Sequence, residues 1–272
     1  MRELFMTTDN FGIRNTGMTM EEEFSKIAEL GFDGIEHHHP ATREVADCLK
    51  RHGLKMIHSE VQFTLDGTED DIDILQEIGV RYVAGRTMAR THEQALRTAE
   101  ELNKIGKKAS EYGFKLFFHN MAAEFIFDRG EYLIETLLKN TDPLYVCSQL
   151  DLGWVVCAGA DPVPFLKKYP GRVELMHVKP CTKIYGMKTV FPIPDPNAPR
   201  DPAAMEEARK RYAVMFSAMQ GPYSELVRDY EEPMKVAESL GCRCFIYERE
   251  QFYSDDHIAV MKDDIENIRK FW

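Results

Sequence analysis

Hydrophobic and polar positions along the chain repeat a single unit. In each unit, apolar residues spaced three and four apart lead to a glycine, and four to six mostly apolar residues follow at once. Gly113 ends one such unit, and Ala95, Ala99 and Leu102 precede it at helical spacing. A glycine is typical just past a helix end, because it reaches positive φ without steric cost. The pattern therefore predicts a helix, a glycine cap and a strand in every unit.

The repeated unit predicts eight strands. Six strands follow glycines, and the apolar segments 4–7 and 144–150 supply two more. Strands that alternate with helices predict a parallel sheet, either closed as a barrel or open and doubly wound. No glycine-rich phosphate loop follows the first strand, which weakens the open, nucleotide-binding alternative. Eight similar units favour a single (β/α)8 TIM barrel domain over residues 1–272. The six glycines are Gly31, Gly53, Gly79, Gly113, Gly171 and Gly241.

The repeat is interrupted once, after the seventh strand, by an insertion at about 180–222. It begins with several prolines and continues as a helical segment. A segment inserted after a barrel strand lies at the carboxyl-terminal face, where it can act as a lid or contact a partner. It can also be a simple solvent-exposed addition. Tyr212, Val214 and Phe216 within it indicate an interface and are consistent with a homo-oligomer.

Charge and composition exclude several classes of function. The formal net charge of −11 argues against a nucleic-acid partner, because a phosphate backbone requires clustered lysine and arginine. The start of the sequence shows no signal peptide, and no apolar run is long enough to cross a bilayer. The six cysteines are scattered and lack paired zinc-ligand spacing, as in a reducing cytosol. We therefore expect a cytoplasmic protein that acts on a small molecule.

Polar residues stand where seven of the eight predicted strands end. A strand that is apolar and then ends in a carboxylate or an imidazole makes a poor core, and barrel active sites are built at these ends. We expect one or two of the three consecutive histidines 37–39 to face the site. Residues without another assigned role are predicted to bind substrate. The strand-end residues are Glu36 and His38, His58 and Glu60, Arg86, His119 and Asn120, Asp151, His177 and Lys179, and Glu248.

Asp151, His177 and Glu248 form the strongest group, because they end the sixth, seventh and eighth strands and are therefore neighbours around the rim. Two carboxylates and an imidazole suit a hard or borderline cation such as Mn²⁺, Mg²⁺, Co²⁺ or Zn²⁺. Such an ion would bind vicinal oxygens of a substrate and polarise its carbonyl, which stabilises the enediolate left by proton loss. The ordered set of residues thus predicts a metal-dependent enzyme.

Four passages resemble a known family, the xylose-isomerase-like barrels described as sugar phosphate isomerases/epimerases. The resemblance implies one divalent metal, Mn²⁺ first, with Mg²⁺, Co²⁺ or Zn²⁺ as alternatives. Its ligands would come from the ends of strands five to eight: either His119 or Glu124, then Asp151, His177 and Glu248. The passages are GFDGIE (31–36), LFFHN with AAEF (116–125), LDLGWVVCAGADPVPFLKKYPGRVELMHVK (150–179) and FIYEREQF (245–252).

The sequence also departs from this family. Many members carry a glutamate at the position of His119, where it is both a metal ligand and an acid/base group. Members with a related histidine motif usually have a second histidine at the position of Met121. An aspartate is common where Pro180 stands in this chain. The familiar two-glutamate proton shuttle is therefore not reproduced. Glu248, His119 or Lys179 remain to move the proton.

Together these observations predict a metal-dependent isomerase or epimerase that removes a proton α to a carbonyl of a sugar or keto-sugar. A lyase or dehydratase acting on a keto-glycoside or keto-cyclitol is the alternative, and a non-catalytic sugar-binding subunit is another. Phosphodiester hydrolysis is disfavoured by the acidic charge. Trp154 is equally suited to stack on a sugar ring or to wedge a helix. Arg86 and Lys179 could bind a phosphate or carboxylate, although no glycine-rich phosphate cradle is evident.

Overall fold

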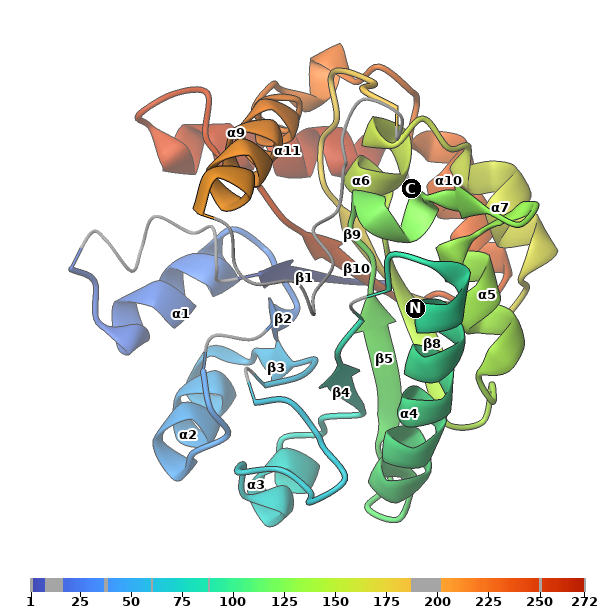
Figure 1. Cartoon of the computed structure of the whole chain (residues 1–272). Helices are drawn as coiled ribbons and strands as arrows, with labels where there is room; N and C mark the ends of the chain where they lie inside the picture. Colours follow the sequence, from blue (N-terminus) through green and yellow to red (C-terminus); the bar gives the residue numbers. More distant parts are fainter. Residues whose placement is uncertain are drawn as a thin grey trace.

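A computed structural model describes residues 2–7, 17–36, 39–59, 61–87, 89–186, 202–249 and 251–271, without the side chains of residues 204, 205, 208, 211 and 212. Eight parallel strands form one curled sheet inside a layer of helices (Figure 1), which confirms the predicted barrel fold. The hydrogen-bonded order is β3-β2-β1-β10-β9-β8-β5-β4. The strands are β1 (Glu3–Thr7), β2 (Gly34–Glu36), β3 (Lys55–Met56), β4 (Tyr82–Gly85), β5 (Lys115–His119), β8 (Val146–Asp151), β9 (Val173–Val178) and β10 (Cys244–Tyr247).

Helices connect consecutive strands. All six glycines predicted to end helices have positive φ, and Gly53, with φ 67°, caps its helix in the left-handed conformation. A short hairpin, β6 (Phe127–Asp128) with β7 (Glu131–Tyr132), follows β5 and was not predicted. The helices are α1 (Met20–Glu29), α2 (Arg43–His52), α3 (Ile72–Glu77), α4 (His92–Ser110), α5 (Leu133–Asn140), α6 (Leu152–Cys157), α7 (Pro162–Lys168), α9 (Pro202–Ser217), α10 (Glu231–Ser239) and α11 (His257–Lys270), with 3₁₀ turns η2 (Ala122–Phe125) and η3 (Tyr223–Glu225).

The strands place two sets of side chains on opposite faces. One set packs outward against the helices and forms the larger core. The other set fills the inside of the barrel. Since side chains alternate along a strand, residues two or four positions beyond an inner residue lie on the same inner face, closer to the carboxyl end. The inner set is Phe5, Ile57, Tyr82, Phe117, Cys147, Leu175, Cys244 and Ile246.

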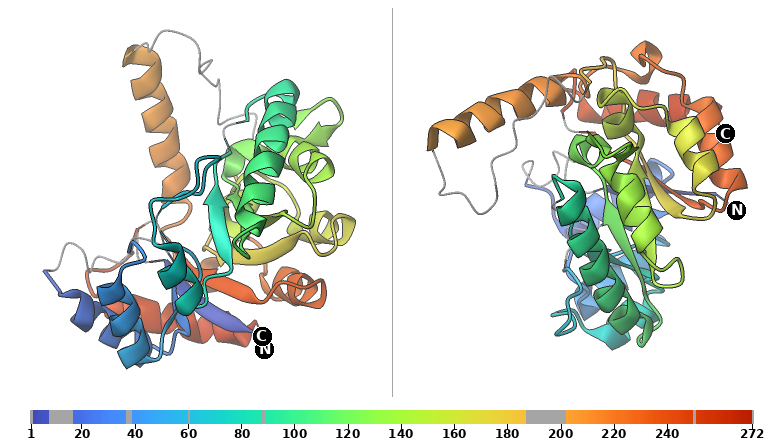
Figure 2. Two further views of the ribbon diagram at one scale, coloured as in Figure 1. Left: turned by 90° about the horizontal axis from the view of Figure 1, so that it is seen from below. Right: turned by 45° about the vertical axis from the view of Figure 1, so that its right-hand side comes forward.

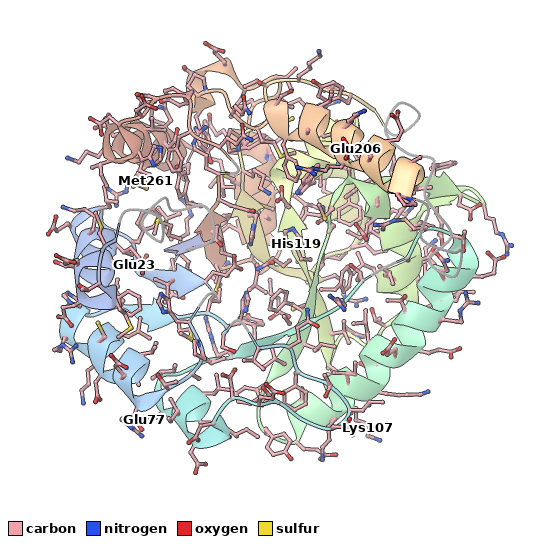
Figure 3. The ribbon with its side chains drawn as sticks, turned by 60° about the vertical axis from the view of Figure 1, so that its left-hand side comes forward. Glu23, Glu77, Lys107, His119, Glu206 and Met261 are labelled. Atoms are coloured by element: carbon pink, nitrogen blue, oxygen red, sulfur yellow. The ribbon has the colours of Figure 1, made fainter. Side chains whose placement is uncertain are left out.

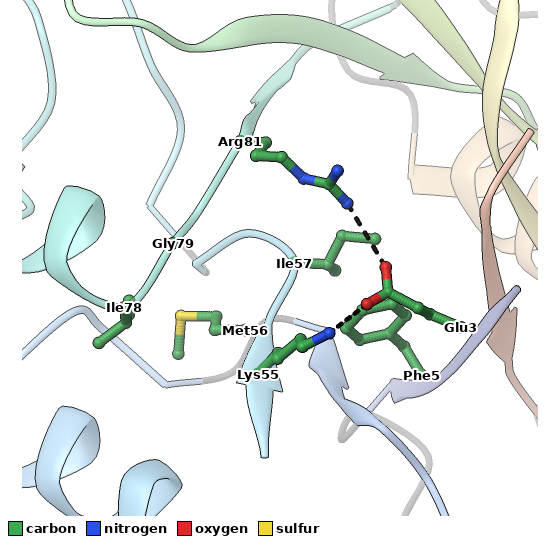
Figure 4. Close-up of a pocket in the computed structure, with 8 residues that line it drawn as sticks. All are labelled: Glu3, Phe5, Lys55, Met56, Ile57, Ile78, Gly79 and Arg81. Atoms are coloured by element: carbon green, nitrogen blue, oxygen red, sulfur yellow. Dashed lines mark hydrogen bonds and ion pairs between the residues drawn. The ribbon is translucent and has the colours of Figure 1, made fainter. Parts of the chain in front are cut away.

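The two terminal strands of the sheet, β3 and β4, leave a seam. A cavity of about 280 Å³ lies along it (Figure 4). The carboxylate of Glu3 pairs there with Lys55 and with Arg81. Lys55 begins β3 and Arg81 directly precedes β4, so this cavity lies at the amino-terminal end of the barrel, opposite the polar strand ends. It is lined by Glu3, Phe5, Lys55, Met56, Ile57, Ile78, Gly79 and Arg81.

Helix α9 belongs to the segment between β9 and α10 and projects away from the barrel (Figure 2). Its carboxyl-terminal end packs against the protein: Met215 is buried, as is Met219 just beyond it, whereas Val214 is exposed. The predicted insertion boundaries remain a prediction, because residues 187–201 lie outside the described part of the chain. Among the described helices, none is both long and apolar enough to cross a membrane.

Candidate active site

Strand alternation brings the predicted site residues together. His119 lies two positions beyond the inner residue Phe117, and His177 lies two positions beyond Leu175. Asp151 and His177 are register partners on neighbouring strands, which places their side chains side by side. His119 lies in the middle of the ring of strands, and the labelled residues of the outer helices lie around it (Figure 3). The carboxyl ends of β5, β8 and β9 therefore meet at one place.

His177 lies between two carboxylates. Its Nδ1 donates to Oε2 of Glu248 at 2.5 Å, and its Nε2 lies 2.8 Å from Oε2 of Glu36. Burial disfavours the charged imidazolium, but these two carboxylates outweigh it and raise the pKa of His177 to about 10. Burial alone would raise the pKa of Glu248, yet Lys179 and His177 hold this pKa below its ordinary value. Without a metal, His177 is thus the counter-ion of both carboxylates.

Asp151 joins strand β8 to helix α6. Its Oδ1 accepts the Trp154 N–H at 2.9 Å and so caps the helix, while its own N–H donates to Oδ1 of Asn120 at 3.0 Å. Its Oδ2 turns to the site, 3.3 Å from Nζ of Lys179 and 3.8 Å from Nε2 of His119. Burial raises the pKa of Asp151 to about 6, although Lys179 opposes this shift.

Lys179 is buried and forms ion pairs with two carboxylates. Its Nζ lies 2.9 Å from Oε1 of Glu248, in addition to its contact with Asp151. The indole of Trp154 lies on another side, 5.2 Å from Nζ, in a cation–π contact. Gly153 makes this packing possible, because a Cβ at that position would lie 3.0 Å from the Cβ of Lys179. The LDLGW passage therefore supplies both a carboxylate and the surface against which the ammonium group is held.

A chain of hydrogen bonds fixes the imidazole of His119. Gln149 donates from its amide nitrogen to Oε1 of Glu36, which leaves the amide oxygen to accept from Nδ1 of His119 at 2.9 Å. Nδ1 therefore carries the proton, and Nε2 presents its lone pair toward Asp151. Burial and the charge of His177 lower the pKa of His119 to about 3, so its ring is neutral at pH 7. Sequence analysis missed Gln149, although its place two residues before Asp151 on an inner face could have indicated it.

Several other predicted residues have different surroundings. His58 belongs to the same network, with Nε2 3.1 Å from Oε1 of Glu36. Glu124 accepts the Met121 N–H at 2.9 Å and lies 3.6 Å from the guanidinium of Arg90; the carboxylate is buried, which raises its pKa. Arg86 is exposed. His38 and Glu60 lie outside the described residues.

Trp154 is 1% exposed, and its ring packs edge-on against Phe216 of α9. In this structure the indole of Trp154 therefore packs between Phe216 of α9 and Lys179. A substrate contact with the ring face stays a prediction that requires Phe216 or Lys179 to move.

The sequence model of the xylose isomerase-like TIM barrel family matches residues 24–188. The chain belongs to this family. The matched region includes His119, Asp151, His177 and Lys179, whereas Glu248 lies beyond it.

Among relatives, the chain is 35% identical over 89 residues to an inosose dehydratase of Clostridium tetani, across 33% of this chain and 29% of that protein. It is 24% identical over 202 residues to inosose dehydratase 1 of Bacillus cereus, across 64% of this chain and 67% of that protein. The first alignment thus spans less than a third of the relative's length.

The fold of this chain resembles the solved structure of a sugar phosphate isomerase/epimerase from Parabacteroides distasonis. It superposes with a TM-score of 0.69 at 17% identity and covers 99% of this chain and 95% of that one. At this identity the likeness concerns the fold alone.

The divalent metal that this family implies fits the side chains present. Ligand atoms of His119, Asp151 and His177 all lie within 4.8 Å of one another. Oδ2 of Asp151 is buried and turns into this group of ligand atoms, where the ammonium group of Lys179, 3.3 Å away, balances its charge. Two imidazoles and a carboxylate are suitable ligands for Mn²⁺, Co²⁺ or Zn²⁺.

Proposed function

We propose that this protein is a metal-dependent isomerase or epimerase that removes a proton α to the carbonyl of a sugar or keto-sugar and returns it. The observation that carries the proposal is the convergence of His119, Asp151 and His177, whose ligand atoms lie within 4.8 Å of one another beside the buried Lys179. A metal-ligand set next to a buried ammonium group is suited to stabilising and reprotonating an enediolate.

In this proposal, His119, Asp151, His177 and Glu248 would hold the metal, with Nε2 of His119, Oδ2 of Asp151 and Nδ1 of His177 as candidate ligand atoms. His119 is preferred to Glu124 as the fourth ligand, because the Met121 N–H and Arg90 already engage the Glu124 carboxylate. Mn²⁺ is the first choice, and Mg²⁺, Co²⁺ and Zn²⁺ are alternatives. The bound ion would polarise the substrate carbonyl and stabilise the negative charge that develops on its oxygen.

The residues around the metal ligands orient groups and move the proton. Gln149 keeps the lone pair of His119 Nε2 directed at the site. Glu248 would take the α-proton of the substrate on its carboxylate. Lys179, which holds a proton at Nζ between Oδ2 of Asp151 and Oε1 of Glu248, would give that proton to the substrate and regain one from the protonated Glu248. A positioned acid–base group of this kind contributes about 10²–10⁴-fold to the rate. The covering side chains, with Trp154 beside Nζ, exclude water from the ammonium group.

Elimination is the second candidate function. It begins with the same proton abstraction but expels a hydroxyl or glycosyl group instead of taking the proton back. The similarity to inosose dehydratases favours it, since that name describes loss of water from a keto-cyclitol. The substrate class would then be a keto-cyclitol or keto-glycoside. The homo-oligomer and the cytoplasmic location remain predictions from sequence.

The test combines metal analysis with proton exchange. The purified protein, loaded with Mn²⁺, is incubated in D₂O with a panel of keto-sugars and keto-inositols, and deuterium and products are followed by NMR and mass spectrometry. We expect about one equivalent of metal and deuterium at the carbon next to the carbonyl. An epimer as product supports the first function and a dehydrated product supports the second.

The Asp151→Asn/His177→Ala variant should lose the metal, and Lys179→Met should keep the metal but lose the exchange. Lys108→Met, at an exposed helical lysine, is the matched control and should behave like the parent. A parent protein that takes up no metal and exchanges no proton would reject both enzymatic functions. In that case a sugar-binding subunit without catalysis becomes the better explanation.

A further inference from the structure

Three potential metal ligands also meet on the outside of the barrel, between α1 and α2. Cys48 and His52 lie one helical turn apart on α2, and Glu21 lies in the first turn of α1. Sγ of Cys48 donates to Oε2 of Glu21 at 3.3 Å, and Nε2 of His52 lies 2.8 Å from Oε1 of the same carboxylate. The ligand atoms of all three residues lie within 4.8 Å of one another.

The kind and spacing of these ligands select a particular class of ion. A cysteine and a histidine at i and i+4 point along the same helix face and can chelate one ion. Sulfur with imidazole nitrogen and one carboxylate oxygen suits Zn²⁺ in tetrahedral coordination, and is poorly suited to Mg²⁺ or Ca²⁺, which prefer oxygen. The fourth position would be taken by water, since Glu21 is half exposed.

We propose that Glu21, Cys48 and His52 form a zinc site that is separate from the candidate active site. On binding, the Cys48 thiol gives its proton to solvent and the thiolate becomes a ligand of Zn²⁺; no electron is transferred. Arg51 now contacts Glu21 and must turn away. Its side chain is 55% exposed, so water can solvate the displaced guanidinium, and an exposed ion pair of this kind contributes little to stability.

The position of this site gives the ion a structural role. Helices α1 and α2 lead into β2 and β3, which among the described residues pair at two positions, Gly34 with Lys55 and Ile35 with Met56. Strand β3 is also one end of the hydrogen-bonded order. An ion that joins α1 to α2 would hold these two strand-helix units together next to the seam. Zn²⁺ is therefore expected to stabilise the folded protein.

Cobalt spectroscopy can test the site directly. The chelator-treated protein is titrated with Co²⁺, and the near-ultraviolet charge-transfer band of a cobalt–thiolate bond is measured. The candidate active-site ligands His119, Asp151, His177 and Glu248 include no sulfur, so this band reports the outer site and its appearance does not depend on the proposed function. We expect the band in the parent and in Cys242→Ala, a matched change at another buried cysteine. Cys48→Ala should lack it.

Two variants outside the buried core, at the half-buried His52 and the exposed Arg51, guard against misfolding of Cys48→Ala. His52→Ala should weaken Co²⁺ binding at least about tenfold, because one ligand is lost. Arg51→Met should tighten binding, because it removes the competitor for Glu21. Zn²⁺ should also raise the thermal midpoint of the parent and not that of His52→Ala. No thiolate band in the parent, a band that persists in Cys48→Ala, or equal affinities in the parent, His52→Ala and Arg51→Met would each overturn the proposal.

Discussion

The buried ion pair between Arg249 and Asp264 should contribute far more to stability than an exposed pair with the same separation. Nε and Nη2 of Arg249 each donate to Asp264 at 2.7 Å, and both side chains are 0% exposed. Tyr247 also donates to Oδ2 of Asp264, at 2.7 Å. Asp264→Ala therefore leaves a guanidinium without its counter-ion and a hydroxyl without its acceptor, both inside the protein. Because Glu248 directly precedes Arg249, the same pair anchors the end of β10 at the candidate site.

Removing one partner of a buried pair costs about 3–5 kcal/mol. With a denaturant dependence of about 2–3 kcal/mol per molar urea, a loss of about 4 kcal/mol lowers the unfolding midpoint by roughly 1.3–2 M. The matched control is Glu77→Ala, which breaks the Arg43–Glu77 pair; these atoms are also 2.7 Å apart, but the side chains are 55% and 52% exposed. That change should cost about 0–1 kcal/mol.

Urea unfolding followed by circular dichroism measures both variants under the same conditions. Arg249→Met/Asp264→Leu should recover much of the loss, since it leaves no uncompensated charge inside the protein. The reasoning fails if Asp264→Ala and Glu77→Ala lower the free energy of unfolding by similar amounts, because burial would then not decide the strength of the pair.

Three further outcomes follow from the candidate site. Because the pKa of His177 is raised from 6.5 to about 10 in the metal-free folded state, its contribution to stability should be fully present below about pH 6.5 and lost as the pH rises toward 10. Urea unfolding of the parent and of His177→Gln at several pH values measures this contribution. The same change of the free energy of unfolding with pH in both proteins would contradict it. Gly153→Ala should cost about 1–3 kcal/mol and slow proton exchange, because the new Cβ meets Lys179 at 3.0 Å; a variant with parent-like stability and exchange would show that α6 moves freely. Gln149→Leu should lower metal affinity or exchange about 10–100-fold by releasing the His119 ring, whereas unchanged values in a calorimetric titration and in the exchange assay would remove Gln149 from the site.

The parts of the fold that sequence predicted are those set by local patterns. Helix spacing, glycines past helix ends and short apolar runs each depend on a few neighbouring residues. All eight strands were found in the expected order, and all six glycines have positive φ. Alternation along the strands is equally local: His119 and His177 each lie two positions beyond an inner residue and share its inward direction.

The rest depends on contacts between distant parts of the chain. The surroundings of Glu124 are set by η2 and by Arg90, which comes from the loop before α4. The burial of Trp154 depends on Phe216, which the inserted helix α9 supplies. Neither partner can be read from the residues next to Glu124 or Trp154. Such long-range pairs decide which strand-end residues remain available to a ligand.

The charges of the site explain how one arrangement can exist both with and without a metal. Glu36 and Glu248 lie on either side of His177, and Lys179 lies between Glu248 and Asp151. In the absence of a metal ion, the positive charges of protonated His177 and Lys179 balance these carboxylates, so the repulsion between the carboxylates is compensated. A divalent ion would replace the proton on Nδ1 of His177, while Glu36 still holds the other side of the ring. The proposed ligands are therefore already positioned without a metal, and the hydrogen bonds that position them come from neighbours such as Gln149 and Asn120.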